Sequence, residues 1–219
     1  MSELAYKTIR VSGADAFEFL QNQLTNDLGL LESEKEILAA WCNPKGRVIW
    51  FGAVYKTDAG YALSVSSDLA EQMVERLTIF RFRSKVEFAI EDGGTVDLAS
   101  LIENGYPAIT VQQSEKFTPH MLNLDLLGAV SVSKGCYPGQ EVVARTHYRG
   151  ATKRRMLRFE SAAPVSAGDK VSDGDRDVGE VLIAAGTNLL AIVPKDKKDQ
   201  ELTVGDVALL NLPLSYLEQ

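Results

Sequence analysis

Apolar side chains along the N-terminal part of the chain follow strand and helix periods in turn. Residues 8–11 alternate polar and apolar side chains and end at Gly13, which is typical of a short strand followed by a turn. Residues 14–26 place apolar side chains at helical spacing, which predicts an amphipathic helix. The same criteria predict strands over 37–42, 48–55, 61–65 and 86–90, helices over 68–80 and 96–104, and a short helical turn near 121–127.

The order of these elements, β-α-β-β-β-α-β, indicates the fold class. Residues 43–46 carry proline at the second position and glycine at the fourth, so the strands on either side should form a hairpin. Gly105, followed by Pro107, should end the helix over 96–104. The pattern predicts an α+β fold with a helix-backed, mostly antiparallel sheet of the ferredoxin-like or split βαβ type.

The pattern changes after Gly150. Short apolar runs separated by glycine, proline and aspartate turns occur at 156–159, 178–183, 189–193 and 207–210. Closely spaced short strands of this kind predict a small C-terminal β-barrel. We therefore expect an α+β domain over residues 1–150 and the barrel over residues 151–219.

Composition and charge narrow the class of protein. The chain of 219 residues has 45% hydrophobic and 24% charged residues, which is ordinary for a globular protein. No run approaches the ~20 apolar residues that cross a bilayer, and the N-terminus does not resemble a signal peptide, so we expect a cytoplasmic protein without membrane contact. The net charge of −7 argues against bulk electrostatic binding of nucleic acid.

The cysteines and histidines do not form a recognisable metal-binding pattern. Cys42 and Cys136 lie far apart, and a cytoplasmic chain would keep both reduced. Cys42 falls in an apolar strand and is expected in the core. His120 and His147 do not complete the four ligands that structural zinc usually takes, so we expect no tightly held metal.

Basic residues are concentrated in one part of this acidic chain. Seven of the 23 Lys and Arg residues lie within 134–158, where Glu141 is the only acid. A local basic region on an acidic protein indicates a specific anionic partner. A solvated surface strand and loop would give the same composition and is the alternative.

Residues 134–141 carry the most distinctive chemistry. Gly135 and Gly139 free the backbone for close approach, and Pro138 suits the first turn of a helix. Cys136 would then precede a helix N-terminus, with the cation of Lys134 nearby, and both features stabilise a thiolate. Cys136 is therefore a candidate reactive cysteine; the alternative is a small buried residue in a loop.

The same segment carries a family resemblance. Its pattern Lys-Gly-Cys-Tyr-x-Gly-Gln-Glu-x-x-x-Arg resembles the signature of YgfZ-type proteins, which are relatives of the T-protein (aminomethyltransferase) of the glycine cleavage system. Residues 13–27, 43–47 and 103–107 resemble the N-terminal motif, the hairpin turn and the Glu-x-Gly-x-Pro element of that group. The resemblance covers most of residues 9–158, and the eight-residue signature is its specific part.

The resemblance implies a cleft that binds tetrahydrofolate or a derivative. By motif match, Glu103 takes the place of a glutamate that binds the pterin, whose adjacent N–H donors suit a carboxylate. The other folate-binding residues that it implies are Lys134, Tyr137, Gln140, Glu141 and Arg145. We further hypothesise that basic residues receive the glutamate tail of the folate, because Arg and Lys clusters suit carboxylates. The candidates, of which some would take this role, are Arg145, Arg149, Lys153, Arg154 and Arg155.

Two departures from the family pattern limit the inferred activity. T-proteins carry an essential aspartate after the hairpin turn, whereas residues 47–52 contain no acid and place Trp50 and Phe51 there. Aminomethyl transfer is therefore not expected. The section before Gly105 is also short, so a second ferredoxin-like half should be reduced or missing, and a homo-oligomer would be one way to close the cleft.

The leading hypothesis is a folate-binding accessory protein that supports assembly or repair of iron–sulfur enzymes, including tRNA-modifying ones, with Cys136 as the working residue. Its partners would be folate, iron–sulfur enzymes or assembly factors and, indirectly, tRNA. One alternative is a folate-dependent one-carbon transferase that uses another acid, such as Glu103 or Glu141. A second alternative is a tRNA- or protein-binding module that uses the basic segment without folate.

Overall fold

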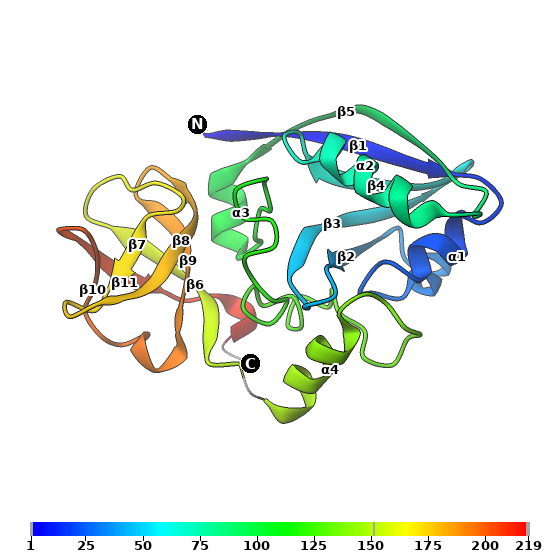
Figure 1. Cartoon of the computed structure of the whole chain (residues 1–219). Coiled ribbons are helices and arrows are strands. Elements are labelled where there is room, and N and C mark those ends of the chain that lie inside the picture. The colour runs from blue at the N-terminus through cyan, green and yellow to red at the C-terminus, as the bar shows by residue number, and fades with distance from the viewer. Residues whose placement is uncertain (1, 151, 218–219) are drawn as a thin grey trace.

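A five-stranded antiparallel sheet occupies one side of the molecule (Figure 1). The computed structural model describes residues 2–150 and 152–217. The sheet has the order β2-β3-β4-β1-β5, and its strands are β1 (Glu3–Ser12), β2 (Glu36–Cys42), β3 (Val48–Thr57), β4 (Gly60–Ser66) and β5 (Glu87–Asp97). The predicted antiparallel sheet and the hairpin between β2 and β3 are confirmed. The ferredoxin-like description of this sheet stays a prediction.

Helix α1 (Ala16–Gln21) is shorter than the predicted helix over 14–26. After Gln21 the chain leaves the helix and pairs with strand β2, because that edge strand offers unpaired backbone groups. The backbone N–H of Thr25 donates to the carbonyl of Ala40 at 2.8 Å, and the Thr25 hydroxyl accepts from the N–H of Ala40 at 2.9 Å. Pairing with the sheet therefore overrides the helical pattern, and a 3₁₀ turn follows at Leu28–Glu32.

Two further helices flank the sheet. Helix α2 (Ala70–Arg81) packs on β1 and β5, and α3 (Leu98–Asn104) follows β5. The Asp97 side chain caps α3 by accepting from the N–H of Ala99 at 3.2 Å. Gly105 ends the helix with φ +68°, as its sequence position predicted. In Figure 1, α3 lies between the sheet and a second group of strands.

Those strands form a closed six-stranded barrel of order β10-β11-β6-β9-β8-β7. They are β6 (Arg154–Ser161), β7 (Lys170–Ser172), β8 (Asp177–Ala185), β9 (Asn188–Pro194), β10 (Leu202–Val204) and β11 (Val207–Leu212). Short 3₁₀ turns lie at Lys195–Lys197, between β9 and β10, and at Ser215–Leu217, after β11. The predicted barrel is confirmed.

Strands β6 and β9 of the barrel contribute side chains to two cores, one inside the barrel and one under the sheet. Along β6, Leu157 and Phe159 face the barrel interior, while Met156 belongs to the core under the sheet. Strand β9 divides in the same way, which explains why it reads as a continuous apolar run. The division into domains at residues 1–150 and 151–219 stays a prediction.

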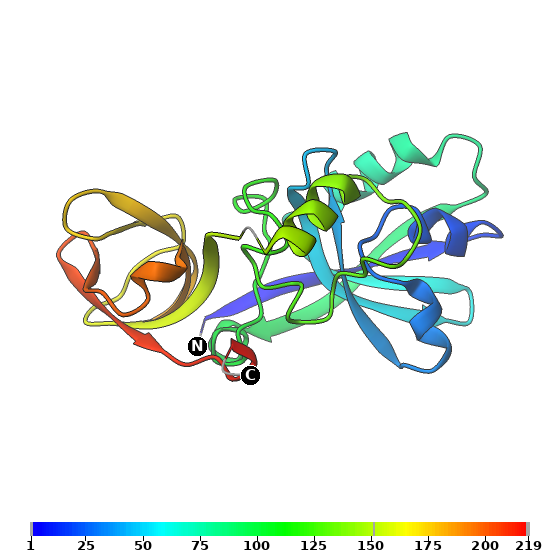
Figure 2. The same ribbon diagram turned by 90° about the horizontal axis from the view of Figure 1, so that it is seen from below.

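Residues 105–139, here called the central segment, connect α3 to α4 and contain no named helix or strand; the segment starts beside the barrel and ends beside α1 (Figures 1 and 2). They are held by buried side chains such as Leu122 and Leu124. Asn123 adopts φ +59° and donates from its amide to the carbonyl of Met156 at 2.7 Å, which fixes the turn to the barrel. Helix α4 (Gln140–Arg149) follows this segment. None of the described helices is long and apolar enough to span a bilayer.

Candidate functional site

Residues 134–139 form a loop that leads into α4. The helix begins at Gln140, and Gly139 is its N-cap with φ +79°. Pro138 lies in the turn before this cap, which corrects the expectation that it would occupy the first helical turn. Gly139 turns the chain sharply before the helix, so the proline remains outside it.

The hairpin turn between β2 and β3 packs directly against the start of α4. A Cβ on Gly139 would lie 2.5 Å from the carbonyl oxygen of Asn43. A Cβ on Gly46 would lie 3.0 Å from the Cβ of Val142. Two stretches that suggested the family, at 43–47 and 134–145, therefore meet through glycine backbones.

Lys134 is buried beneath the loop and does not present its charge to Cys136. Its ammonium group donates to three carbonyl oxygens at and just after the end of α1, those of Gln21, Leu24 (2.7 Å) and Asn26 (3.2 Å). Burial lowers the pKa of Lys134 to about 8, while the negative charge of Asp27 opposes the shift. The lysine that we expected beside a thiolate thus holds the N-terminal motif against the loop.

Cys136 lies on the exposed side of this loop. The side-chain amide of Gln140 reaches back to the carbonyls of Lys134 and Gly135, at 3.3 and 3.5 Å, and braces the loop that carries the thiol. Cys42, by contrast, is buried, and burial raises the pKa of its thiol to about 12. The prediction that Cys42 belongs to the core is confirmed.

Tyr137 fills the space behind the loop. Its ring lies 5.4 Å from the Lys134 Nζ and is buried. Burial raises the pKa of its hydroxyl group, and the nearby thiol of Cys42 adds a smaller upward contribution. Among the described residues this hydroxyl has no hydrogen-bond partner. Tyr137 therefore supports the loop from inside the protein.

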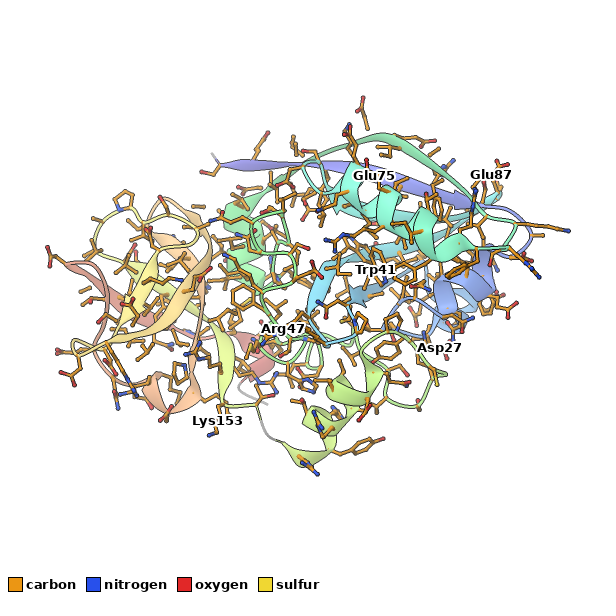
Figure 3. The ribbon with its side chains drawn as sticks, in the orientation of Figure 1. Asp27, Trp41, Arg47, Glu75, Glu87 and Lys153 are labelled. Carbon is orange, nitrogen blue, oxygen red and sulfur yellow. The ribbon has the colours of Figure 1, made fainter. Side chains whose placement is uncertain are left out.

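The remaining charged residues of the motif helix face solvent. Glu141 lies in the first turn of α4, where a carboxylate complements the helix dipole, and Arg145 and Arg149 are exposed farther along. Lys153 is also exposed and lies at the periphery (Figure 3). Within residues 2–150 and 152–217, none of these three basic side chains takes part in an ion pair.

Arg155 is already paired inside the protein. Its guanidinium group binds both carboxylate oxygens of Asp125, at 2.6 and 2.8 Å, and donates to the carbonyl of His120 at 3.0 Å. Both partners of the ion pair are largely buried. The guanidinium group of Arg155, one of the candidates for an anionic tail, thus already has a carboxylate partner within the protein.

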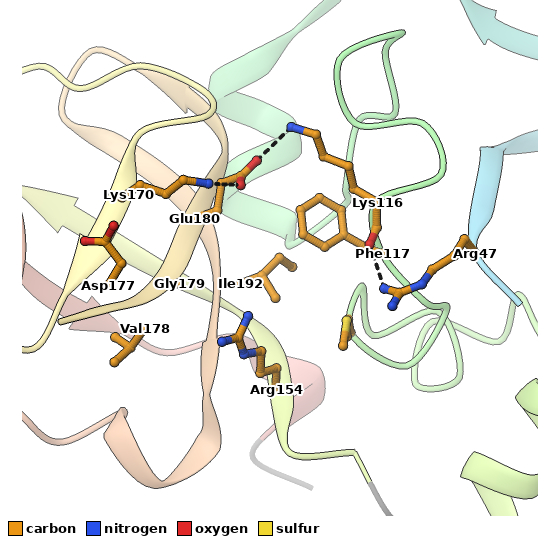
Figure 4. A pocket seen from close by; sticks show the side chains of 11 residues that line it. Arg47, Lys116, Phe117, Arg154, Lys170, Asp177, Val178, Gly179, Glu180 and Ile192 are labelled. Atoms are coloured by element: carbon orange, nitrogen blue, oxygen red, sulfur yellow. Dashed lines mark hydrogen bonds and ion pairs between the residues drawn. The ribbon is translucent and has the colours of Figure 1, made fainter. Parts of the chain in front are cut away.

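Arg154, the neighbouring residue, instead lines a pocket of about 350 Å³ between the barrel and the central segment (Figure 4). Arg47, from the hairpin turn, stands on the other side of this pocket and donates to the carbonyl of Lys116 at 2.7 Å. Sequence reasoning missed Arg47 and Lys116 because they lie far from the basic segment in the chain.

Two more lysines border the same pocket. Lys116 and Lys170 both pair with Glu180, at 3.0 and 2.5 Å. Their charge is thus partly compensated, whereas in the part of the chain that the structure describes Arg47 and Arg154 form no ion pair. The two arginines therefore offer positive charge to an anion there, against the negative charge of Asp177, which lines the same pocket.

The structure does not bring Glu103 to the cysteine loop. Glu103 is exposed near the end of α3, which packs against β5, β8 and β9, whereas the loop packs against the hairpin turn (Figure 1). A small pocket of about 140 Å³ beside the 103–107 element is lined by Phe51 and Tyr106, among others, and Glu103 does not line it. Phe51 is buried in β3, within the stretch 47–52 that contains no acid.

Comparisons with known proteins identify the family of this chain. No protein-family model matches the chain. An uncharacterized protein of Haemophilus influenzae is 30% identical, with 71% of each chain aligned. Proteins named "tRNA-modifying protein YgfZ" from Klebsiella pneumoniae and Escherichia coli are 27% and 25% identical; the alignments cover 80% and 85% of this chain and 77% and 78% of theirs. The chain belongs to the YgfZ family.

The YgfZ family assignment is matched by the fold. The crystal structure of the glycine cleavage system aminomethyltransferase T from Bartonella henselae superposes with a TM-score of 0.77 and covers 99% of this chain and 86% of that one. The sequence identity is 14%, so this likeness shows a shared fold alone. The resemblance that residues 134–145 suggested is therefore confirmed at the level of the family.

Proposed function

We propose that this chain is a cytoplasmic, folate-binding accessory protein that supports tRNA modification by sustaining iron–sulfur enzymes, with Cys136 as its working residue. The name of its YgfZ relatives and its aminomethyltransferase-like fold support the folate and tRNA-modification context. The observation that carries the role of the thiol is its placement. Cys136 is exposed on a loop that is anchored at both ends, by Lys134 below and by Gly139 against the hairpin.

A fixed and accessible thiol suits transient contact with a labile cluster or a protein partner. The thiolate is the form of cysteine that binds metals and attacks disulfides, so access is the first requirement. The loop supplies access, and its anchors limit the conformations that the cysteine can adopt. A buried thiol such as Cys42 could not reach a partner.

Strand β3 favours this accessory role over one-carbon transfer. Trp50 and Phe51 are both buried there, and the indole N–H of Trp50 donates to the carbonyl of Ser64 at 3.0 Å. Neither side chain can supply the acid–base function of a carboxylate. The proposal therefore does not assign an aminomethyl transfer step.

For the folate itself, we place the glutamate carboxylates between Arg47 and Arg154. Guanidinium groups bind carboxylates in a bidentate manner, and the pocket between these two arginines is open to solvent. Arg145, Arg149 and Lys153 could meet a longer tail, since they extend from α4 toward the start of β6. Arg155 is excluded from this set by its bond to Asp125.

The cysteine role is tested by complementation. Cells that lack the protein are supplied with wild type, Cys136→Ser or Cys42→Ala, and the level of an iron–sulfur-dependent tRNA modification is measured. Cys136→Ser should fail to restore the modification although the variant folds, while Cys42→Ala, the matched loss of the other thiol, should restore it. Full restoration by Cys136→Ser would overturn the role of the thiol.

Folate binding is tested separately. Tetrahydrofolate with one or three glutamates is titrated while the fluorescence of Trp41 and Trp50 is recorded. Wild type should bind the longer form more tightly, and Arg154→Gln should lose that preference, whereas Lys198→Gln, an exposed lysine that does not line the pocket, should keep it. Absence of any folate-dependent change, checked by calorimetry, would remove folate from the proposal and leave the cysteine role standing.

A further inference from the structure

Two histidines and an aspartate that are separated in the sequence come together at the C-terminal end of α4. His120, Asp125 and His147 each offer one ligand atom, and these atoms all lie within 4.8 Å of one another. The two imidazole rings are tilted at 49° with centroids 5.9 Å apart. The residues come from the central segment and from α4, so only the fold joins them.

Hydrogen bonds to backbone groups fix the positions from which these three side chains extend. His120 and Asp125 lie on either side of Asn123, whose left-handed conformation reverses the chain and whose amide is bonded to β6. The N–H of Asn123 donates to the carbonyl of His120 at 3.3 Å. His147 lies in the last turn of α4, and Gly150 closes that helix by donating to the carbonyl of His147 at 3.2 Å.

His120 is the unusual member of the group. Its side chain is only 2% exposed, and among the described residues neither of its ring nitrogens has a hydrogen-bond partner. Buried polar atoms are nearly always bonded, because an unsatisfied one forfeits its hydration. A neutral imidazole that faces a second imidazole and a carboxylate offers the nitrogen lone pair that a metal ion requires.

Asp125 is oriented by Arg155. The bidentate bond holds both carboxylate oxygens, each of which has lone-pair capacity left for a second partner. Groups that bond to a metal-ligating carboxylate in this way fix its direction and tune the site. The positive charge of Arg155 should also weaken the attraction of a cation, so we expect a site of lower affinity than a set of three histidines would give.

We propose that His120, Asp125 and His147 form a binding site for a divalent first-row transition metal such as Zn²⁺. Three atoms no more than 4.8 Å apart lie within about 2.8 Å of a common centre, against about 2.0–2.2 Å for bonds from zinc to nitrogen or oxygen. The ligands must therefore close by less than about 1 Å, which the exposed His147 side chain permits by a small rotation.

This ligand set determines the kind of metal and the consequence of binding. Two imidazoles and a carboxylate suit zinc or ferrous iron rather than calcium or magnesium, and three protein ligands leave a position for water. Binding would join α4 to the central segment at the end of the helix remote from Cys136. It should therefore stabilise the helix whose other end supports the cysteine loop.

The site is tested by calorimetric titration of the metal-free full chain with Zn²⁺ and by the visible spectrum after addition of Co²⁺. Both use a Cys136→Ser background, so that the exposed thiol cannot bind the ion. We expect one equivalent of metal per chain, a d–d spectrum of nitrogen and oxygen ligands, and a higher melting temperature in the presence of Zn²⁺.

The variants separate this site from incidental binding. His147→Ala lies on the surface and should fold normally, yet it should lower the affinity by about tenfold or more. Asp125→Asn keeps the size of the side chain and should also weaken binding, whereas Tyr148→Phe, next to His147 on the same helix, should not. Equal affinity in His147→Ala and its parent, or no binding of one equivalent in the parent, would overturn the proposal.

Discussion

A Cβ atom on Gly139 would lie 2.8 Å from the Cα of Gly46, so these two glycines pack backbone to backbone. The contact joins the hairpin turn after β2 to the N-cap of α4. From the sequence, Gly139 was expected to free the backbone so that another group could approach. The structure identifies one such group as the protein's own hairpin.

We predict that Gly139→Ala strongly destabilises the protein. Alanine would meet both the strained φ of +79° and the backbone of Gly46 and Asn43, so the free energy of unfolding should fall by about 2–4 kcal/mol. Gly150→Ala is the matched control, because its φ is +58° but no atom of the described residues lies within 4 Å of the added Cβ. It should cost only about 1–2 kcal/mol. Urea denaturation measures both, and equal losses would contradict the packing role.

The two thiols should differ in their reaction with a thiol reagent. Cys136 is exposed, whereas Cys42 is buried and its pKa is raised to about 12, so at pH 8 only Cys136 should react in the folded protein. A colorimetric disulfide reagent should count one thiol in buffer and two in denaturant. Cys136→Ser should show none in buffer; rapid reaction of this variant would mean that Cys42 is reached through local opening.

Lys134 should make stability depend on pH in the alkaline range. Its folded pKa of about 8 lies below the value of about 10.4 in an unfolded chain. Between these values the unfolded state binds more protons, so the free energy of unfolding should rise with pH relative to a Lys134→Met variant. Denaturation at pH 7.5 and 9.5 tests the sign. A difference between wild type and variant that shrinks as pH rises would show that the carbonyl oxygens keep the ammonium charged.

The ion pair between Arg155 and Asp125 should contribute far more to stability than a surface pair. Asp125 is 8% exposed and Arg155 15%, so Arg155→Leu leaves a largely buried carboxylate without its partner and should cost about 3 kcal/mol. Lys56 pairs with Glu32 at 2.7 Å, but these side chains are 48% and 73% exposed. Lys56→Ala should therefore have a much smaller effect on the free energy of unfolding, a contrast that thermal or urea unfolding resolves.

Local patterns in the sequence determined the elements and several of their ends. Alternating and continuous apolar runs predicted the five strands of the sheet and four of the six barrel strands, because burial of one or both faces dictates those patterns. Strands β7 and β10 were missed, since three residues are too few to show a period. Gly105 was correctly expected to end α3, since its backbone tolerates the left-handed conformation of a helix terminus. The motif over 134–145 by itself indicated the family.

Tertiary structure decided what the charged and polar groups do, because their partners lie far away along the chain. Helix α1 stops at Gln21 because Thr25 forms hydrogen bonds with β2. Lys134 donates to carbonyl oxygens more than a hundred residues away in sequence. No local pattern predicted that Arg155 would be paired while Arg154 would face a pocket, or that His120 and His147 would meet. Apolar periodicity reports which face of an element is buried, whereas the partner of a polar group depends on which elements the fold packs together.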